Sequence, residues 1–202
     1  MISVKAALPR PAYPPFMRVL IVYGTTEGQT EKIAGYARDR LDAQGHSVIL
    51  ANAGTAPAPA DFDAVILAAS LHVGKYQAPI VAYAHLHRLD LQARPNAFIS
   101  VSLSAAGHDQ RDWAGVERCL KQFIDATGWT PRTVHQAAGA LRYSQYNWLT
   151  RIFMRRIARE RGADTRHDVE FTDWQALGSF LNAFAPTQKR SPDAPKLDLR
   201  AG

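Results

Sequence analysis

Short apolar runs alternate along the chain with longer segments in which apolar residues recur every three or four positions. The short runs are rich in β-branched residues, which is typical of strands buried on both faces of a parallel sheet. Their regular alternation with helical segments predicts βα units. We therefore expect an α/β fold with a doubly wound, five-stranded parallel sheet. The predicted strands are residues 18–23, 47–51, 64–69, 97–101 and 134–141.

Helical spacing is clearest in residues 31–43 and around residues 116–124. Gly45 and Gly128 follow these two segments, at positions where glycine commonly ends a helix. A last helix is predicted to begin at Thr172-Asp173-Trp174-Gln175, because this sequence has the capping-box pattern.

The two ends of the chain depart from this pattern. Residues 1–17 are rich in proline and are predicted to form a flexible extension. Residues 186–202 are polar with few large apolar side chains and are predicted to be a disordered tail. The folded domain is therefore expected over residues 18–185, with an insertion at about 142–173.

Composition excludes several classes of protein and favours certain partners. The 202 residues carry a net charge of +6, which favours anionic partners. No apolar stretch is long enough to cross a bilayer. A single cysteine, Cys119, excludes an intrachain disulfide framework and fits a cytoplasmic protein. The sequence shows no nucleic-acid recognition motif, no metal-ligand cluster and no nucleophile-base triad, so we expect neither nucleic acid nor a metal as ligand.

The turn after the first strand has the chemistry of a phosphate site. It reads Gly24-Thr25-Thr26-Glu27-Gly28-Gln29-Thr30 and leads into a helix. Backbone N–H groups, threonine hydroxyls and the helix dipole together bind phosphate. The turn lacks both the Gly-Lys-Ser/Thr of nucleotide triphosphate loops and the G-x-G-x-x-G of dinucleotide turns. It therefore predicts a monophosphate site, with an ordinary helix start capped by Thr26 or Glu27 as the alternative.

Two further turns are expected to face the same crevice, because doubly wound sheets bind ligands at the carboxyl ends of their strands. The turn after the third strand offers a glycine, small residues and the ring of Tyr76 as a wall for a flat heteroaromatic ligand, although His72 and Tyr76 equally suit an ordinary loop. The turn after the fourth strand offers small residues and free amides. The candidate ligand-binding residues here are Ser70, Leu71, His72, Gly74, Ser102, Leu103, Ser104 and Ala105.

The sequence from residue 18 to about 184 resembles the flavodoxin-like FMN-binding family. Within that family it is similar to the HemG-type, quinone-dependent protoporphyrinogen IX dehydrogenases of bacteria. Gly28-Gln29-Thr30 and Ala69-Ser70 with Gly74 and Tyr76 are shared with many flavodoxins. More specific are the runs at 138–143 (AGALRY), 164–166 (DTR) and 171–174 (FTDW). The resemblance implies that residues 25–30 hold the FMN phosphate, while residues 70–74 and 102–105 line the ribityl chain and the isoalloxazine.

The resemblance also implies an activity. FMN would accept hydride equivalents from protoporphyrinogen IX, and ubiquinone or menaquinone would reoxidise the flavin at the inner face of the cell membrane. The cofactor carries this chemistry, so no residue is an obligatory acid or base. Arg142, Tyr143 and Arg166, which belong to the specific runs, are candidates for placing the substrate.

Other functions stay open. A flavodoxin-type electron carrier is the main alternative, but such carriers are typically acidic so as to dock on basic partners, and this chain is basic. A nicotinamide-dependent quinone reductase would use the same fold, although no dinucleotide motif is present. A flavin-free interaction domain would be colourless when purified.

The insertion is the main departure from a minimal flavodoxin. Apolar residues share one side of a predicted helix over residues 146–161, and arginines occupy the other sides. Three interpretations remain. The helix packs on its own domain, or it lies on an anionic membrane surface, or its arginines bind the carboxylates of the substrate.

Overall fold

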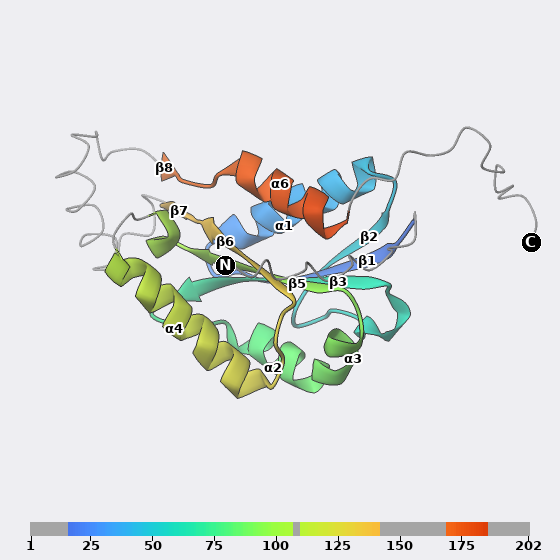
Figure 1. Ribbon diagram of the computed structural model, residues 1–202, viewed down its shortest axis with the longest axis horizontal. Helices are drawn as coiled ribbons and strands as arrows, with labels where there is room; N and C mark the ends of the chain where they lie inside the picture. The colour runs from blue at the N-terminus through green and yellow to red at the C-terminus, as the bar shows by residue number, and fades with distance from the viewer. Residues whose placement is uncertain (1–15, 107–109, 142–168, 186–202) are drawn as a thin grey trace, which may run out of the picture.

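A computed structural model describes residues 16–106, 110–141 and 169–185 of the chain. Five parallel strands form its central sheet, in the spatial order β2-β1-β3-β5-β6 (Figure 1). They are β1 (Arg18–Gly24), β2 (Ser47–Asn52), β3 (Ala64–His72), β5 (Asn96–Ser102) and β6 (Thr133–Ala138). The strand order reverses direction at β1, so the doubly wound sheet predicted from the sequence is confirmed.

Helices cover both faces of the sheet. On one face lie α1 (Gln29–Ala43) and α6 (Trp174–Phe184), and on the other lie α2 (Ala78–Leu86), α3 (Arg88–Ala93) and α4 (Gln110–Thr127) (Figure 1). Two short 3₁₀ helices, η1 (Pro59–Asp61) and η2 (Ser104–Ala106), lie in the connections. In the described ranges no helix is both long and apolar enough to cross a membrane.

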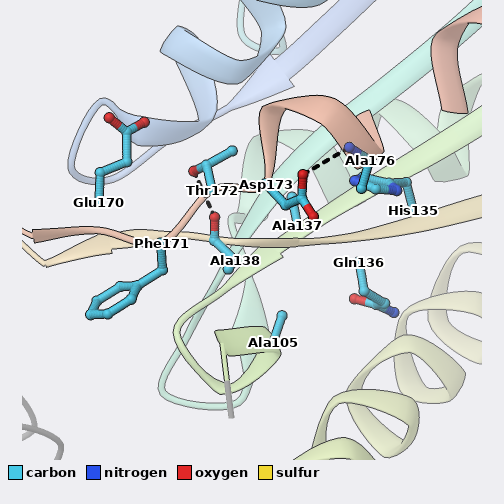
Figure 2. A pocket seen from close by; sticks show the side chains of 10 residues that line it. All are labelled: Ala105, His135, Gln136, Ala137, Ala138, Glu170, Phe171, Thr172, Asp173 and Ala176. Carbon is cyan, nitrogen blue, oxygen red and sulfur yellow. Dashed lines mark hydrogen bonds between the residues drawn. The ribbon is translucent and has the colours of Figure 1, made fainter. Parts of the chain in front are cut away.

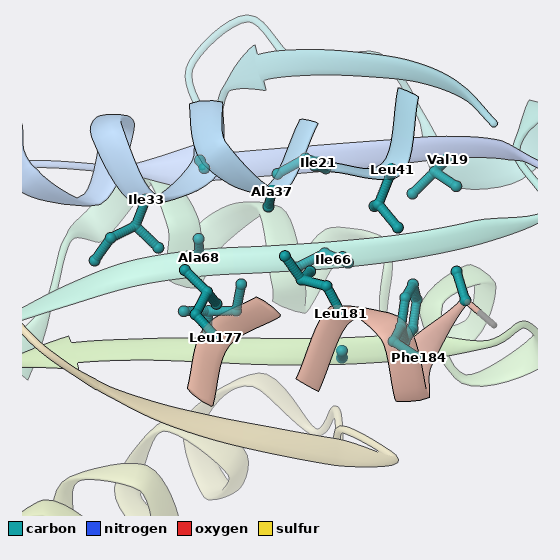
Figure 3. Close-up of a cluster of buried hydrophobic side chains, with 14 of the residues drawn as sticks. Val19, Ile21, Ile33, Ala37, Leu41, Ile66, Ala68, Leu177, Leu181 and Phe184 are labelled. Atoms are coloured by element: carbon teal, nitrogen blue, oxygen red, sulfur yellow. The ribbon is translucent and has the colours of Figure 1, made fainter. Parts of the chain in front are cut away.

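Each face of the sheet has its own hydrophobic core. Figure 3 shows the first, where Ile21 and Ile66 of the sheet meet Ile33 of α1 and Leu177 and Leu181 of α6. All five side chains are fully buried. Burying a side chain of this size is worth about 1.5–3 kcal/mol. The amphipathic spacing of α1 and α6 is therefore explained by their packing on one face.

The second core is aromatic. Phe98 of β5 stacks on Phe123 of α4 with ring centroids 4.8 Å apart and planes 7° from parallel. Trp129 and Tyr76 meet this pair edge-on. Offset stacked and edge-to-face contacts are the favoured arrangements of aromatic rings. This cluster fixes α4 against the sheet and thereby the position of the connection from β5.

The helix ends follow the predicted glycines at two positions and depart from the prediction at a third. Gly45 and Gly128 both have positive φ, of 92° and 69°, as helix-ending glycines do. At α6 the cap is Asp173, whose Oδ1 accepts a hydrogen bond from the Ala176 amide at 2.8 Å. Thr172 was expected to open this helix and does not, because its hydroxyl donates to the Ala138 carbonyl at 2.8 Å.

The predicted fifth strand is wrong in its extent. It ends at Ala138, where its neighbour β5 also ends, and the chain beyond Gly139 forms β7 (Ala140–Leu141). β7 pairs antiparallel with β8 (Val169–Glu170) in a separate two-stranded sheet. The Gly139 carbonyl accepts from the Phe171 amide at 3.1 Å. After Ala138 the chain therefore pairs with residues 169–171 instead of continuing in the central sheet.

The region after the third strand, predicted as a turn, forms a β-hairpin. β3 continues to His72 and forms a hairpin with β4 (Lys75–Tyr76). Val73 and Gly74 form its two-residue turn with φ of 48° and 76°. Positive φ at both positions is the geometry that matches the twist of a hairpin. Gly74 suits it, whereas a β-branched residue such as Val73 rarely adopts it.

The domain begins one residue earlier than expected. Met17, assigned to the flexible extension, is 1% exposed and belongs to the first core. Its carbonyl accepts from the Ser47 amide at 2.9 Å. The remaining predictions for the extension, the tail and the helix over 146–161 lie outside the described residues. So do the substrate candidates Arg142, Tyr143 and Arg166.

Candidate functional site

Three connections meet at the carboxyl ends of three adjacent strands. They follow β1, β3 and β5, which are neighbours in the sheet. Contact between the first two is direct, because the Gln77 amide donates both to Thr26 Oγ1, at 2.9 Å, and to Ser70 Oγ. The third turns at η2 immediately after Ser102, the last residue of β5. The three predicted loops are therefore at one edge of the sheet.

The first connection presents an uncapped helix start. Gly28 is the N-cap of α1, with φ of 85°, and no side chain caps it. The alternative of a helix capped by Thr26 or Glu27 is therefore wrong. The Gly28 amide instead donates to Thr25 Oγ1 at 2.9 Å, which tightens the turn. Because the first helical bond runs from Lys32 to Gly28, the preceding amides of the first turn have no helical acceptor.

Thr30 supplies the strongest evidence for an anion here. Its side chain is fully buried, yet Oγ1 has no hydrogen-bond partner among the described residues. An unpaired buried hydroxyl costs about 1–3 kcal/mol. A phosphate oxygen at the N-terminus of α1 would pair with this hydroxyl, so the residues present fit a phosphate group.

Gln29 differs from its neighbours. Its side chain is buried, and Nε2 donates to Glu170 Oε1 at 2.8 Å and to Thr172 Oγ1 at 3.0 Å. The side-chain amide of Gln29 is therefore engaged by residues 170 and 172, at and just after the end of β8. Gln29 therefore offers the phosphate site its backbone N–H rather than its side chain.

Gln77 was not identified from the sequence. It is the N-cap of α2, and its side chain bridges the first and second connections. Its Oε1 is buried without a partner among the described residues. A Cβ added at Gly24 would lie 3.2 Å from this oxygen, so glycine at the end of β1 allows Gln77 to approach. The Ala-Pro that follows Gln77 marks a helix start, but nothing local in the sequence indicates the bridge.

Tyr76 does not form the predicted wall for a flat ligand. Its ring packs in the aromatic core, and its hydroxyl lies 2.8 Å from Ser100 Oγ. Burial raises the pKa of Tyr76 to about 12, against a smaller lowering by the Ser100 hydrogen bond. His72, by contrast, is exposed on the hairpin. Val73, at the tip of the hairpin and within the predicted range 70–74, is 64% exposed.

Ser102 stabilises the turn that begins the third connection. Its side chain is buried, and Oγ accepts from the Ala105 amide at 3.1 Å, which starts η2. Leu103, Ser104 and Ala105 are half-buried at this turn. No three His, Cys, Asp or Glu side chains gather as a metal site within the described ranges.

A separate cavity of about 470 Å³ lies beside the edge strand β6 (Figure 2). Its apolar lining is Ala105, Ala137, Ala138, Phe171 and Ala176. Ala105 is the residue it shares with the predicted ligand loops. Burial lowers the pKa of His135, another lining residue, although the nearby Asp173 carboxylate opposes this shift. No local pattern in the sequence indicates this cavity, because it lies between segments that are distant along the chain.

Comparisons with known proteins agree with this architecture. The sequence profile of the flavodoxin domain matches residues 20–168. The chain is 31% identical over 173 residues to the protoporphyrinogen IX dehydrogenase [quinone] of Escherichia coli K12, covering 84% of this chain and 95% of that protein. It is 30% identical to the protein of the same name from Leishmania major, covering 89% and 79% of the two chains.

The fold is also that of solved flavodoxins. A short-chain flavodoxin associated with a bacterial microcompartment superposes with a TM-score of 0.52 at 16% identity, covering 83% of this chain and 96% of that one. The chain therefore belongs to the flavodoxin-domain family, in the group of the quinone-dependent protoporphyrinogen IX dehydrogenases.

Proposed function

We propose that this protein oxidises protoporphyrinogen IX to protoporphyrin IX, with bound FMN as the redox cofactor and a quinone as the electron acceptor. The relatives that carry this activity in their names match most of the chain at 30–31% identity. The structural observation that supports it is the buried, unpartnered hydroxyl of Thr30 at an uncapped helix start. Together they favour an FMN enzyme over a flavin-free domain.

The first connection would hold the FMN phosphate. The phosphate would be bound by the hydroxyls of Thr25, Thr26 and Thr30 and by the backbone N–H groups of Glu27, Gln29 and Thr30, while the Gly28 N–H stays bonded to Thr25 Oγ1. Gln77 keeps Thr26 in place from the second connection. A helix start of this kind binds an anion without a lysine, because the N–H groups and the helix dipole supply the positive potential.

The second and third connections would hold the rest of the cofactor. Ser70, Leu71, His72 and Gly74 lie on one side, and Ser102, Leu103, Ser104 and Ala105 on the other. FMN supplies the capacity to accept two electrons in each oxidation step. The protein's own part is to orient the ring between these two turns and to restrict the access of water.

The acceptor is ubiquinone or menaquinone, both lipid-soluble, so the protein would work at the inner face of the cell membrane. The helix that the sequence predicts over residues 146–161 is basic and would contact anionic lipid there. Arg142, Tyr143 and Arg166 would place the substrate. Loss of oxidation on Arg142→Ala with FMN binding unchanged supports that placement, and full activity of this variant contradicts it.

The test is quinone-dependent formation of protoporphyrin. FMN-loaded protein receives protoporphyrinogen IX under low oxygen, with and without added quinone, and product fluorescence is followed. We expect product to accumulate only with quinone. A yellow protein that gives no product would contradict the proposal and favour an electron carrier. A colourless protein that binds no added FMN would contradict the cofactor assignment itself.

A further inference from the structure

Residues 170–174 follow one face of α1, the helix that begins at the proposed phosphate site. Gln29, Lys32 and Tyr36 all contact this segment, and positions with this spacing lie on one side of a helix. Farthest from the helix start, the Tyr36 hydroxyl donates to the Trp174 carbonyl at 3.3 Å, and the two rings lie 4.9 Å apart. Nearest to the start is Gln29, whose contacts therefore bear on the phosphate turn itself.

Gln29 belongs to the phosphate turn through its backbone. Its N–H is among the amides of the first turn that have no helical acceptor, and the next residue is Thr30, whose buried hydroxyl is unpartnered among the described residues. Its side chain is 8% exposed and donates to both Glu170 and Thr172. A buried amide with two acceptors has little freedom to rotate, so these bonds also restrict the backbone of the turn.

Thr172 connects Gln29 to the edge strand of the sheet. Its hydroxyl accepts from Gln29 Nε2 at 3.0 Å and donates to the Ala138 carbonyl at 2.8 Å, the second of which is drawn in Figure 2. Ala138 is the last residue of β6, which β3 and β5 separate from β1 in the sheet. The Thr172 hydroxyl thus joins the turn after β1 to the end of a strand with which β1 does not pair.

Glu170 gives α1 a second point of attachment. Its carboxylate accepts from Gln29 through Oε1 and from Lys32 through Oε2, at 2.8 and 2.7 Å. Because Lys32 lies about one turn after Gln29, this pair of bonds opposes rotation of α1 about its axis. The Lys32 ammonium also offsets the charge of a carboxylate that would otherwise repel an anion at the helix start.

We propose that Thr172 is a positioning residue for the FMN phosphate and acts through the side chain of Gln29. The inference rests on the proposed function and deepens it, because it gives the segment after β8 a part in cofactor binding. The phosphate turn would be held in its binding conformation before FMN arrives, so less conformational entropy is lost on binding. The effect belongs to the phosphate end of the cofactor, because Thr172 lies outside the connections after β3 and β5.

The experiment compares the affinity of the full-length protein for FMN and for riboflavin, which has the same ring and ribityl chain but no phosphate. Quenching of flavin fluorescence measures both. Thr172→Val removes the hydroxyl at similar size, and Gln29→Leu removes the amide. We expect FMN binding to weaken about threefold in the first variant and about tenfold in the second, with riboflavin affinity unchanged in both. Thr172→Ser keeps the hydroxyl and should bind FMN nearly as wild type does.

Two further variants separate positioning from packing. Tyr36→Phe removes a hydrogen bond between α1 and Trp174 but keeps the ring, so the ratio of the two affinities should stay unchanged. The double variant Gln29→Leu/Thr172→Val should bind FMN no more weakly than Gln29→Leu alone, because Thr172 acts through Gln29.

Three results would overturn the role of Thr172. They are unchanged FMN affinity in Thr172→Val, equal losses of FMN and riboflavin affinity in that variant, and an equally large change of the affinity ratio in Tyr36→Phe. The proposed function fails separately. Wild-type protein that binds FMN more tightly than riboflavin, but forms no product with quinone, contradicts the activity and leaves the role of Thr172 standing.

Discussion

The side-chain amide of Gln29 donates to the Glu170 carboxylate at 2.8 Å, joining residues that are 141 positions apart. Gln29 is the first residue of α1, and Glu170 ends β8. Lys32, one turn further along α1, contacts the other carboxylate oxygen at 2.7 Å. The helix that begins at the proposed phosphate site is thus fixed to the segment that returns from the insertion.

The Glu170 contacts predict a pH-dependent stability. Burial alone would raise the pKa of Glu170, but hydrogen bonds from Lys32 and Gln29 and the charge of Lys32 together lower it below 4.5. A lowered folded-state pKa stabilises the protein above the unfolded value, and this stability is lost as pH falls through the folded value. We expect Glu170→Gln to reduce the free energy of unfolding by about 1 kcal/mol at pH 7.

Urea unfolding at pH 7 and at pH 3 checks this prediction. The difference between wild type and Glu170→Gln should shrink at pH 3. Asp125→Asn, which removes an exposed pair with Lys121 on α4, is the control and should have a smaller effect. A difference that is the same at both pH values would contradict the assignment.

Thr30 predicts opposite effects on stability and on cofactor binding. Thr30→Val removes a buried hydroxyl without a described partner, so the FMN-free protein should become more stable by about 1 kcal/mol. The same change should weaken FMN binding about tenfold, because a contact to the phosphate is lost. Urea unfolding and quenching of FMN fluorescence measure the two effects.

Thr127 offers a matched control for this change. It is equally buried, but its hydroxyl donates to the Phe123 carbonyl at 2.8 Å and accepts from the Trp129 amide at 3.2 Å. Thr127→Val should therefore destabilise the protein and leave FMN affinity unchanged. Equal behaviour of the two variants would refute the role of Thr30.

The hydrogen bonds of Gln77 hold two connections of the proposed FMN site together before the cofactor binds. Gln77→Ala removes the bridge between Thr26 and Ser70, so the two connections should need ordering when FMN binds. We expect FMN affinity to fall about threefold to tenfold, measured by fluorescence quenching. Gln92→Ala, whose side chain contacts the Thr130 amide far from this site, should bind FMN as wild type does. Tighter binding by Gln77→Ala would show that the bridge obstructs the site.

The cap of α6 predicts that Asp173 contributes more to stability than its polar neighbour in the first turn. Asp173→Ala should lower the free energy of unfolding by about 1 kcal/mol, the usual contribution of an N-cap side chain. Gln175→Ala, on the exposed face of the same first turn, should change it by less than about 0.5 kcal/mol. Thermal or urea unfolding of the two variants separates these outcomes. Equal stabilities would argue against Asp173 as the cap.

Several elements were predictable because their causes are local. The apolar runs predicted all five strands of the central sheet, and the α1 and α6 patterns predicted the faces that pack on it. Gly45 and Gly128 marked helix ends because positive φ favours glycine. The hydroxyl-rich turn after β1 indicated an anion site from residues that are close together in the chain. In each case neighbouring residues contain the physical information.

What the sequence alone determined is therefore the α/β class, the strand positions and the chemistry of the first turn. Only the tertiary structure decided that Tyr76 lies in the core, that Gln77 bridges Thr26 across 51 residues, and that Gln29 meets Glu170. These contacts depend on strand order, on register and on where β6 gives way to β7. Side chains that belong to different crossover units meet through the packing of the whole sheet, which local spacing does not encode.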